Sequence, residues 1–122
     1  MKLRVRGNSL RFRLTQGEVS KLLTDGKVSE SVDFHSSGTD LLNYSIEVCR
    51  DTTQVAARFE NGEILVTLPT HLVASWASSD QVGIESMQPA DKERGLRIVI
   101  EKDFQCLQPR FEEDESDNFP HP

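Results

Sequence analysis

The chain has 122 residues and a formal net charge of −6 at pH 7, and 36% of its residues are hydrophobic. This length can build one hydrophobic core but not two, and no apolar run reaches the roughly 20 residues that a membrane helix needs. The acidic balance argues against nucleic acid as the partner of the whole domain. Since no secretory signal is recognisable, we expect one cytoplasmic domain with no membrane association.

The first predicted element is a hairpin over residues 2–14, where charged and apolar residues alternate on either side of Gly7-Asn8. A two-residue loop there places Leu3 opposite Phe12 on an apolar face. The other face carries only cations, and like charges that lie opposite each other are unfavourable. We therefore expect the basic face to meet acidic neighbours or an anionic ligand.

A short helix is predicted after this hairpin. Thr15 and Glu18 have the T-x-x-E spacing of a capping box, and Gly26 supplies a stop. Alternating patterns then predict strands over 28–34 and 42–49.

The second half of the chain repeats this order. A hairpin is predicted over 55–68, because Asn61-Gly62 is the preferred pair for a type I′ turn. A helix is expected to begin near Thr70, and strands over 82–87 and 96–104 complete the half.

The two halves superimpose without a gap when residue i is laid over residue i+54. This repeat offset places Leu22 on Trp76 and Val28 on Val82, and it brings the two turns together. A ββαββ unit given twice predicts pseudo-twofold symmetry. We therefore predict an α+β fold, mainly β: an antiparallel eight-stranded barrel with two short helices, whose closure leaves no exposed strand edges.

The predicted barrel domain covers residues 1–108, with half-repeats 2–50 and 56–104. Residues 109–122 form an acidic tail that ends in proline. Its composition predicts a solvated segment and not a metal site.

The function depends on which strand face lies inside the barrel. If the apolar face lies inside, the charged face is an outer layer of ion pairs, and we expect a non-enzymatic binding or interaction module without a cofactor. If the charged face lies inside, its cations line a tunnel for a small phosphorylated anion and its carboxylates hold Mg²⁺. The candidate anion ligands are Lys2, Arg4, Arg6, Arg11, Arg13, Arg58 and Arg97, and the candidate metal ligands are Glu47, Glu60, Glu85 and Glu101.

The chain order from Leu10 onward, one strand, a helix and three strands given twice, resembles that of the CYTH-type triphosphate tunnel enzymes. This resemblance implies Mg²⁺-dependent binding or hydrolysis of a phosphate ester or triphosphate. Those enzymes begin with an E-x-E-x-K strand, whereas this chain begins with KLRVR, so no catalytic residue is assigned.

Two further resemblances concern the basic hairpin. The stretch VRGNSLRFRL resembles the swapped-hairpin DNA-binding proteins of the AbrB/MazE type, which implies phosphate contacts by Arg4, Arg6, Arg11 and Arg13. KLRVRGNSLRFRLTQGEV together with IEKDFQCL resembles a family of small bacterial proteins of unknown function, which implies one intact domain. The leading hypothesis is thus a binding module; the alternatives are a tunnel-type phosphate protein and a nucleic-acid binder.

Overall fold

The computed structural model describes residues 1–35, 38, 41–104 and 117–120. The first half contains β1 (Lys2–Val5), β2 (Ser9–Leu14), α1 (Gln16–Asp25), β3 (Lys27–Asp33) and β4 (Leu41–Cys49). The second half contains β5 (Ala56–Glu60), β6 (Glu63–Pro69), α2 (Thr70–Ala77), β7 (Gly83–Pro89) and β8 (Gly95–Lys102). The ββαββ order of each half is therefore confirmed. Most of the predicted tail lies outside the described residues, and the domain limits 1–108 stay a prediction.

Both predicted turns form as expected. Arg6 and Ser9 exchange two backbone hydrogen bonds around Gly7-Asn8, so that Leu3 pairs with Phe12. Asn61 and Gly62 both have positive φ, 51° and 74°, as a type I′ turn requires.

The capping box of α1 is also confirmed. The Thr15 hydroxyl accepts a bond from the Glu18 backbone N–H, and Gly26 ends the helix with a φ of 79°. α2 begins after Pro69 without a side-chain cap. In the part of the chain that the structure describes, no helix has the length and apolar character needed to cross a membrane.

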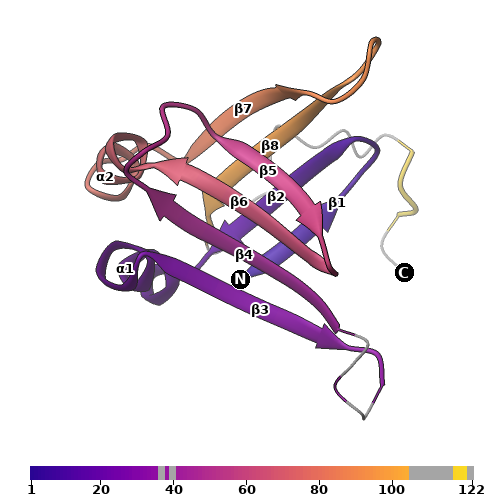
Figure 1. Ribbon diagram of the computed structural model, residues 1–122, viewed down its shortest axis with the longest axis horizontal. Coiled ribbons are helices and arrows are strands. Elements are labelled where there is room, and N and C mark those ends of the chain that lie inside the picture. The colour runs from indigo at the N-terminus through magenta and orange to yellow at the C-terminus, as the bar shows by residue number, and fades with distance from the viewer. Residues whose placement is uncertain (36–37, 39–40, 105–116, 121–122) are drawn as a thin grey trace.

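The strands form two four-stranded sheets, and each half contributes two strands to each sheet (Figure 1). The first sheet has the order β1-β2-β8-β7, and the second has the order β3-β4-β6-β5. The central pairs β2/β8 and β4/β6 are parallel, so the all-antiparallel prediction is wrong for them. The reason is topological: both strands of each central pair run toward the end of the molecule that carries the helices (Figure 1).

The closed barrel is not confirmed, because the described strands pair into two separate sheets with edges at β1, β7, β3 and β5. A side chain bridges one of the gaps between the sheets. The Gln88 amide of β7 accepts from the Ala57 N–H and donates to the Ala57 carbonyl of β5, at 2.8 Å in both bonds. An amide thus replaces the strand ladder that would have closed the barrel there.

The pseudo-twofold relation holds for the central strands. Leu10 pairs with Ile98 in the first sheet, and Ile64 pairs with Tyr44 in the second, as the repeat offset requires.

The predicted match of Val28 with Val82, however, is wrong. Ile84 and Val28 are both buried and pair with Ile100 and Ile46, so residue i corresponds to residue i+56 in β7. The offset grows because residues 78–82 connect α2 to β7, whereas Gly26 alone connects α1 to β3. It returns to 54 in β8, because the turn over 90–94 between β7 and β8 is shorter than the segment 34–40 between β3 and β4.

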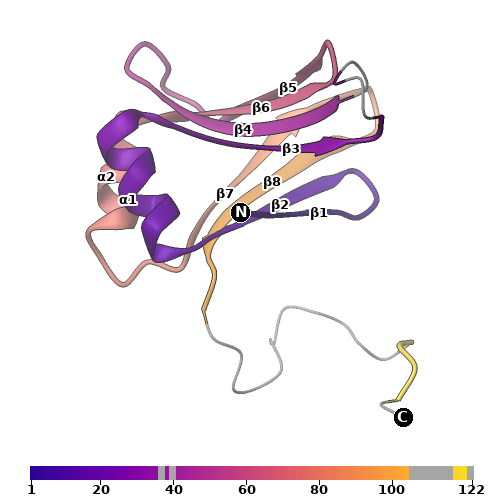
Figure 2. The same ribbon diagram turned by 90° about the horizontal axis from the view of Figure 1, so that it is seen from below.

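The apolar strand faces meet between the two sheets, and the helices close one end of this core (Figure 2). Phe12, Leu22, Ile46, Trp76 and Ile100 are all completely buried. The strand residues that alternate with this set, the predicted charged face, therefore lie on the outside of the sandwich. The prediction of a tunnel lined by charged side chains is thereby contradicted.

Glu18 links α1 to the start of β1. Its carboxylate accepts bonds from the Met1 ammonium group and from the Thr15 N–H, the latter at 2.9 Å. Burial raises the pKa of Glu18, but these bonds outweigh burial and hold the pKa below its ordinary value of 4.5. Burial likewise lowers the pKa of the Met1 amine, but bonds to Glu18 and Glu30 hold it above its ordinary value of 8.0.

This ion pair makes stability depend on pH. The Glu18 contribution is present above its unfolded pKa and is lost as pH falls through its lowered folded pKa. Glu18→Gln should cost about 1 kcal/mol at neutral pH, and the deficit should shrink on acidification. Thermal unfolding followed by circular dichroism from about pH 3 to about pH 7 measures this deficit. Glu93→Gln, at an exposed position, is the control; a Glu18→Gln deficit that is independent of pH would contradict the assignment.

Candidate functional site: an apolar cleft between the sheets

An apolar cleft of about 420 Å³ lies between the two sheets, near the hairpin turns. Its position follows from the fold: both helices lie at the opposite end of the sandwich, whereas the hairpin turns between β1 and β2 and between β5 and β6 lie at this end (Figure 2). The lining residues come from the strands β1, β2, β4, β5, β6 and β8, and they are Val5, Leu10, Leu42, Ala57, Arg58, Phe59, Ile64 and Leu96.

Equivalent residues of the two halves form opposite parts of the cleft. Three pairs of lining residues are related by the repeat offset, and they are Val5 with Phe59, Leu10 with Ile64, and Leu42 with Leu96. The cleft is therefore a product of the repeat, because neither half could form it alone. The symmetry is broken at the rim, where an aliphatic side chain in one half corresponds to an aromatic ring in the other.

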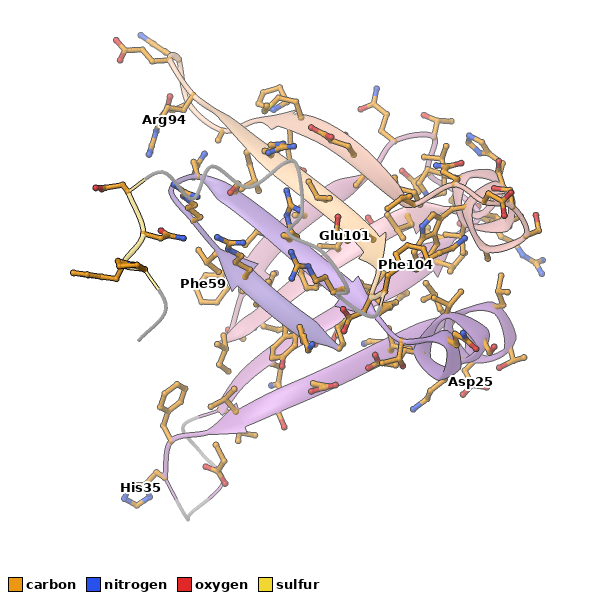
Figure 3. The ribbon with its side chains drawn as sticks, turned by 180° about the vertical axis from the view of Figure 1, so that it is seen from behind. Asp25, His35, Phe59, Arg94, Glu101 and Phe104 are labelled. Carbon is orange, nitrogen blue, oxygen red and sulfur yellow. The ribbon has the colours of Figure 1, made fainter. Side chains whose placement is uncertain are left out.

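The rim exposes much more apolar surface than the interior of the cleft. Val5 is 62% exposed and Phe59 is 69% exposed, and Phe59 lies on the turn side of the molecule, far from Asp25 at the end of α1 (Figure 3). The other apolar lining residues are partly buried. Large apolar side chains that remain exposed around a concave surface typically mark a binding site.

Among the lining residues that the structure describes, Arg58 is the only charged one; it belongs to the outer face of the edge strand β5 and borders the cleft from there. It also borders a polar hollow of about 350 Å³ on the second sheet, together with Asn43, Glu60, Asn61 and Glu63. No ion pair joins Arg58 to a carboxylate of the described residues. A guanidinium beside an apolar wall can bind the acidic end of a ligand whose remainder is apolar.

The predicted basic residues are mostly gathered elsewhere, on the outer face of the first sheet. Arg13 donates from Nε to Glu101 Oε1 at 2.8 Å, and Arg11 Nη1 lies 3.4 Å from the same oxygen. Glu101 is only 5% exposed, although it belongs to the outer face (Figure 3). The acidic neighbour that the basic hairpin requires is thus supplied by β8.

Two further ion pairs lie on this face. Arg97 donates to Glu85 at 2.8 Å, and this bond, opposed by partial burial, lowers the pKa of Glu85. Lys2 Nζ lies 3.1 Å from Asp103 Oδ2. Arg4 lies in β1 and Arg6 follows it, whereas Arg58 belongs to the second sheet. The structure therefore gathers six of the seven predicted cations around the first sheet, and their role as anion ligands stays a prediction.

The predicted metal ligands are not brought together. Glu85 and Glu101 belong to the first sheet, whereas Glu47 and Glu60 belong to the second. Across residues 1–35, 38, 41–104 and 117–120, no three His, Cys, Asp or Glu side chains are grouped as a metal site requires.

The cleft itself was missed by the reasoning from sequence. Alternation correctly pairs Phe59 with Ile64, but it cannot distinguish a covered apolar residue from one at an open rim. The available signal was its position two residues before the Asn61-Gly62 turn, at the end of a strand, where no predicted helix can cover it.

A family model matches residues 1–122 over their whole length, and its description is "Family of unknown function (DUF7009)". The chain belongs to the DUF7009 family. Neither curated proteins nor solved structures yield a match to it.

Proposed function

We propose that this DUF7009 protein is a non-enzymatic binding module that takes a small amphipathic anion in the cleft between its sheets. The apolar part of the ligand lies between the two sheets, and its acidic group lies beside Arg58. The observation that carries the proposal is the lining: within the described part of the chain, seven apolar residues and a single cation surround a cleft of about 420 Å³.

The size and chemistry of the cleft favour a small molecule. Ligand sites in proteins measure about 300–1,000 Å³ and are mostly apolar, with a few polar groups that orient the ligand. Each buried CH₂ group contributes about 0.8 kcal/mol, and burial of the ring of Phe59 adds about 1.5–3 kcal/mol. Because association itself costs several kcal/mol, we expect micromolar affinity for a ligand of this kind.

The same lining favours binding over catalysis by side chains. General acid or base catalysis needs a titratable group whose pKa lies near the working pH and which reaches the reacting atom. Among the described residues, Arg58 is the only ionisable side chain of the lining, and a guanidinium offers donors but no acceptor for a proton. The cleft therefore supplies apolar contact and one fixed positive charge.

Competition binding tests the proposal, with decanoate displacing a fluorescent anilinonaphthalene sulfonate. Phe59→Ser should weaken decanoate binding about tenfold or more, because it removes apolar surface worth over about 1.4 kcal/mol. Phe34→Ser is the matched control, since Phe34 is 70% exposed and Phe59 is 69% exposed, but Phe34 lies outside the cleft. Equal effects of the two variants would overturn the proposal.

The acidic end of the ligand is tested separately. Arg58→Gln should weaken decanoate by about tenfold and leave decanol nearly unchanged, because only decanoate carries a charge. Arg94→Gln, which removes an exposed arginine outside the cleft, should leave both ligands unchanged. Equal loss of both ligands in Arg58→Gln would contradict the role given to Arg58.

A further inference from the structure

We propose that the outer edge of β3 is a self-association site, at which β3 strands of two copies pair antiparallel. β3 lies along the border of the molecule (Figure 1) and is the last strand of the second sheet. Such a pairing would join the two second sheets into one continuous sheet. The site is independent of the cleft, which lies between the two sheets.

The other three sheet edges are short or protected. β1 spans only Lys2–Val5. On β5, the Gln88 amide already occupies the N–H and the carbonyl of Ala57. On β7, the Gln81 side chain donates to the Gly83 carbonyl, and Pro89 has no N–H. Features of this kind prevent edge pairing in natural sheets. β3 has seven residues and no proline, and no side chain of the described residues caps its edge-facing backbone groups; its charged residues are Lys27, Glu30 and Asp33.

The backbone of β3 presents alternate residues to this open edge. Val48 donates to the Gly26 carbonyl at 2.9 Å, so the even-numbered residues of β3 form the hydrogen-bonded pairs with β4. The N–H and carbonyl groups of Ser29 and Ser31 consequently point away from β4. Among the residues that the structure describes, no strand pairs with this edge.

The sequence of β3 is self-complementary in the antiparallel direction. It reads KVSESVD, and a twofold axis at Glu30 pairs Lys27 with Asp33 of the second copy. The same axis pairs Val28 with Val32 and Ser29 with Ser31. In the pairs Ser29–Ser31 and Lys27–Asp33, the backbone N–H and carbonyl groups of both residues face the open edge. Each of these pairs can therefore exchange two hydrogen bonds between the copies. Sequence and backbone thus select the same register.

The side chains support this register on both faces. Opposite charges stand across from each other at both ends of the strand pair, which favours antiparallel pairing. Val32 is 41% exposed in the single chain, and Val28 of the second copy would cover it in the dimer. Burial of this exposed valine adds an apolar contact at each end.

The two Glu30 side chains meet at the axis, and each already has partners in its own copy. Glu30 Oε1 accepts from the Met1 ammonium group at 2.5 Å, and Oε2 accepts from the Tyr44 hydroxyl at 3.3 Å. The ammonium charge compensates the carboxylate on each side. The only like-charged pair of the register is therefore screened before the copies meet.

Sedimentation velocity over a concentration series of the full chain tests the proposal. The wild type should form dimers, whereas Lys27→Asp and Asp33→Lys should each weaken dimerisation about tenfold or more, because both create two like-charged pairs. An equimolar mixture of the two variants should dimerise again, since every end pair of the mixed dimer is then opposite in charge. Asp25→Lys, a charge reversal at an exposed position on α1, is the control and should dimerise as the wild type does.

A backbone variant tests the same register independently of charge. Ser31→Pro removes an N–H that faces the open edge, so the monomer should keep its fold while dimerisation is abolished. Circular dichroism checks the fold of this variant. A wild type that stays monomeric at about 200 μM would overturn the proposal, since that concentration far exceeds the Kd of a specific interface. So would a dimer that persists in Ser31→Pro, or a variant mixture that fails to associate.

Discussion

Trp76→Ala is expected to lower the free energy of unfolding by about 3–5 kcal/mol, the largest loss for a single substitution in this chain. Trp76 is completely buried at the end of the core where α2 meets the sheets. Its indole Nε1 donates to the Val82 carbonyl at 3.0 Å. The substitution therefore creates a large cavity and removes one of the two hydrogen bonds that the Val82 carbonyl accepts, while the Lys102 N–H still donates to it at 3.0 Å.

Urea denaturation measures this loss. Trp76→Leu is the informative comparison, because Leu22 occupies the equivalent position in the first half and is also completely buried. Leucine should recover part of the stability through its apolar volume but not the hydrogen bond to Val82. The control is Phe34→Ala at an exposed position, where the loss should stay within about 0.5 kcal/mol. A loss for Trp76→Ala below about 1 kcal/mol would contradict the described packing.

Glu101→Ala should destabilise the protein by about 2 kcal/mol, which is a large effect for a residue on an outer sheet face. The carboxylate is 5% exposed and bonds to Arg13, while Arg11 approaches the same oxygen. Its removal leaves two guanidinium groups with side-chain exposures of only 13% and 19% close together. Because both groups retain some access to water, the loss should remain smaller than for a fully buried pair.

Glu85→Ala is the matched control for this prediction. Glu85 also belongs to the first sheet and bonds to an arginine at 2.8 Å, but the two side chains are 59% and 40% exposed. Exposed pairs contribute less than about 1 kcal/mol. Denaturation of both variants in parallel should therefore separate them clearly; equal losses would show that burial of Glu101 has no energetic consequence.

The two outer faces of the sandwich differ in charge, although the same repeat builds both. Arg11 and Arg13 of β2 correspond to Leu65 and Thr67 of β6 at the repeat offset. The outer face of the first sheet is therefore basic, and the buried Glu101 carboxylate is its counter-ion. The repeat preserved the inner, apolar face and changed the outer one, because only the inner face must fit the shared core.

Most local features could be predicted from sequence because short-range physics decides them. The alternation over 2–14 determined the register of the first hairpin, and Asn61-Gly62 determined the second turn. The capping box at Thr15 determined where α1 begins. Each of these signals lies within a few residues, where turn geometry and side-chain capping leave few alternatives.

What the sequence determined by itself was the set of elements, their repeated order and, for most strands, the division into an apolar and a polar or charged face. Only the tertiary structure decided that the hairpins of the two halves pair in parallel at the centre of two separate sheets. It also decided that Phe59 borders an open cleft while Glu101 is buried. The physical reason is that alternation specifies which side chains of a strand share a face. The burial of those side chains depends on which strands lie beside that strand and on what covers the face.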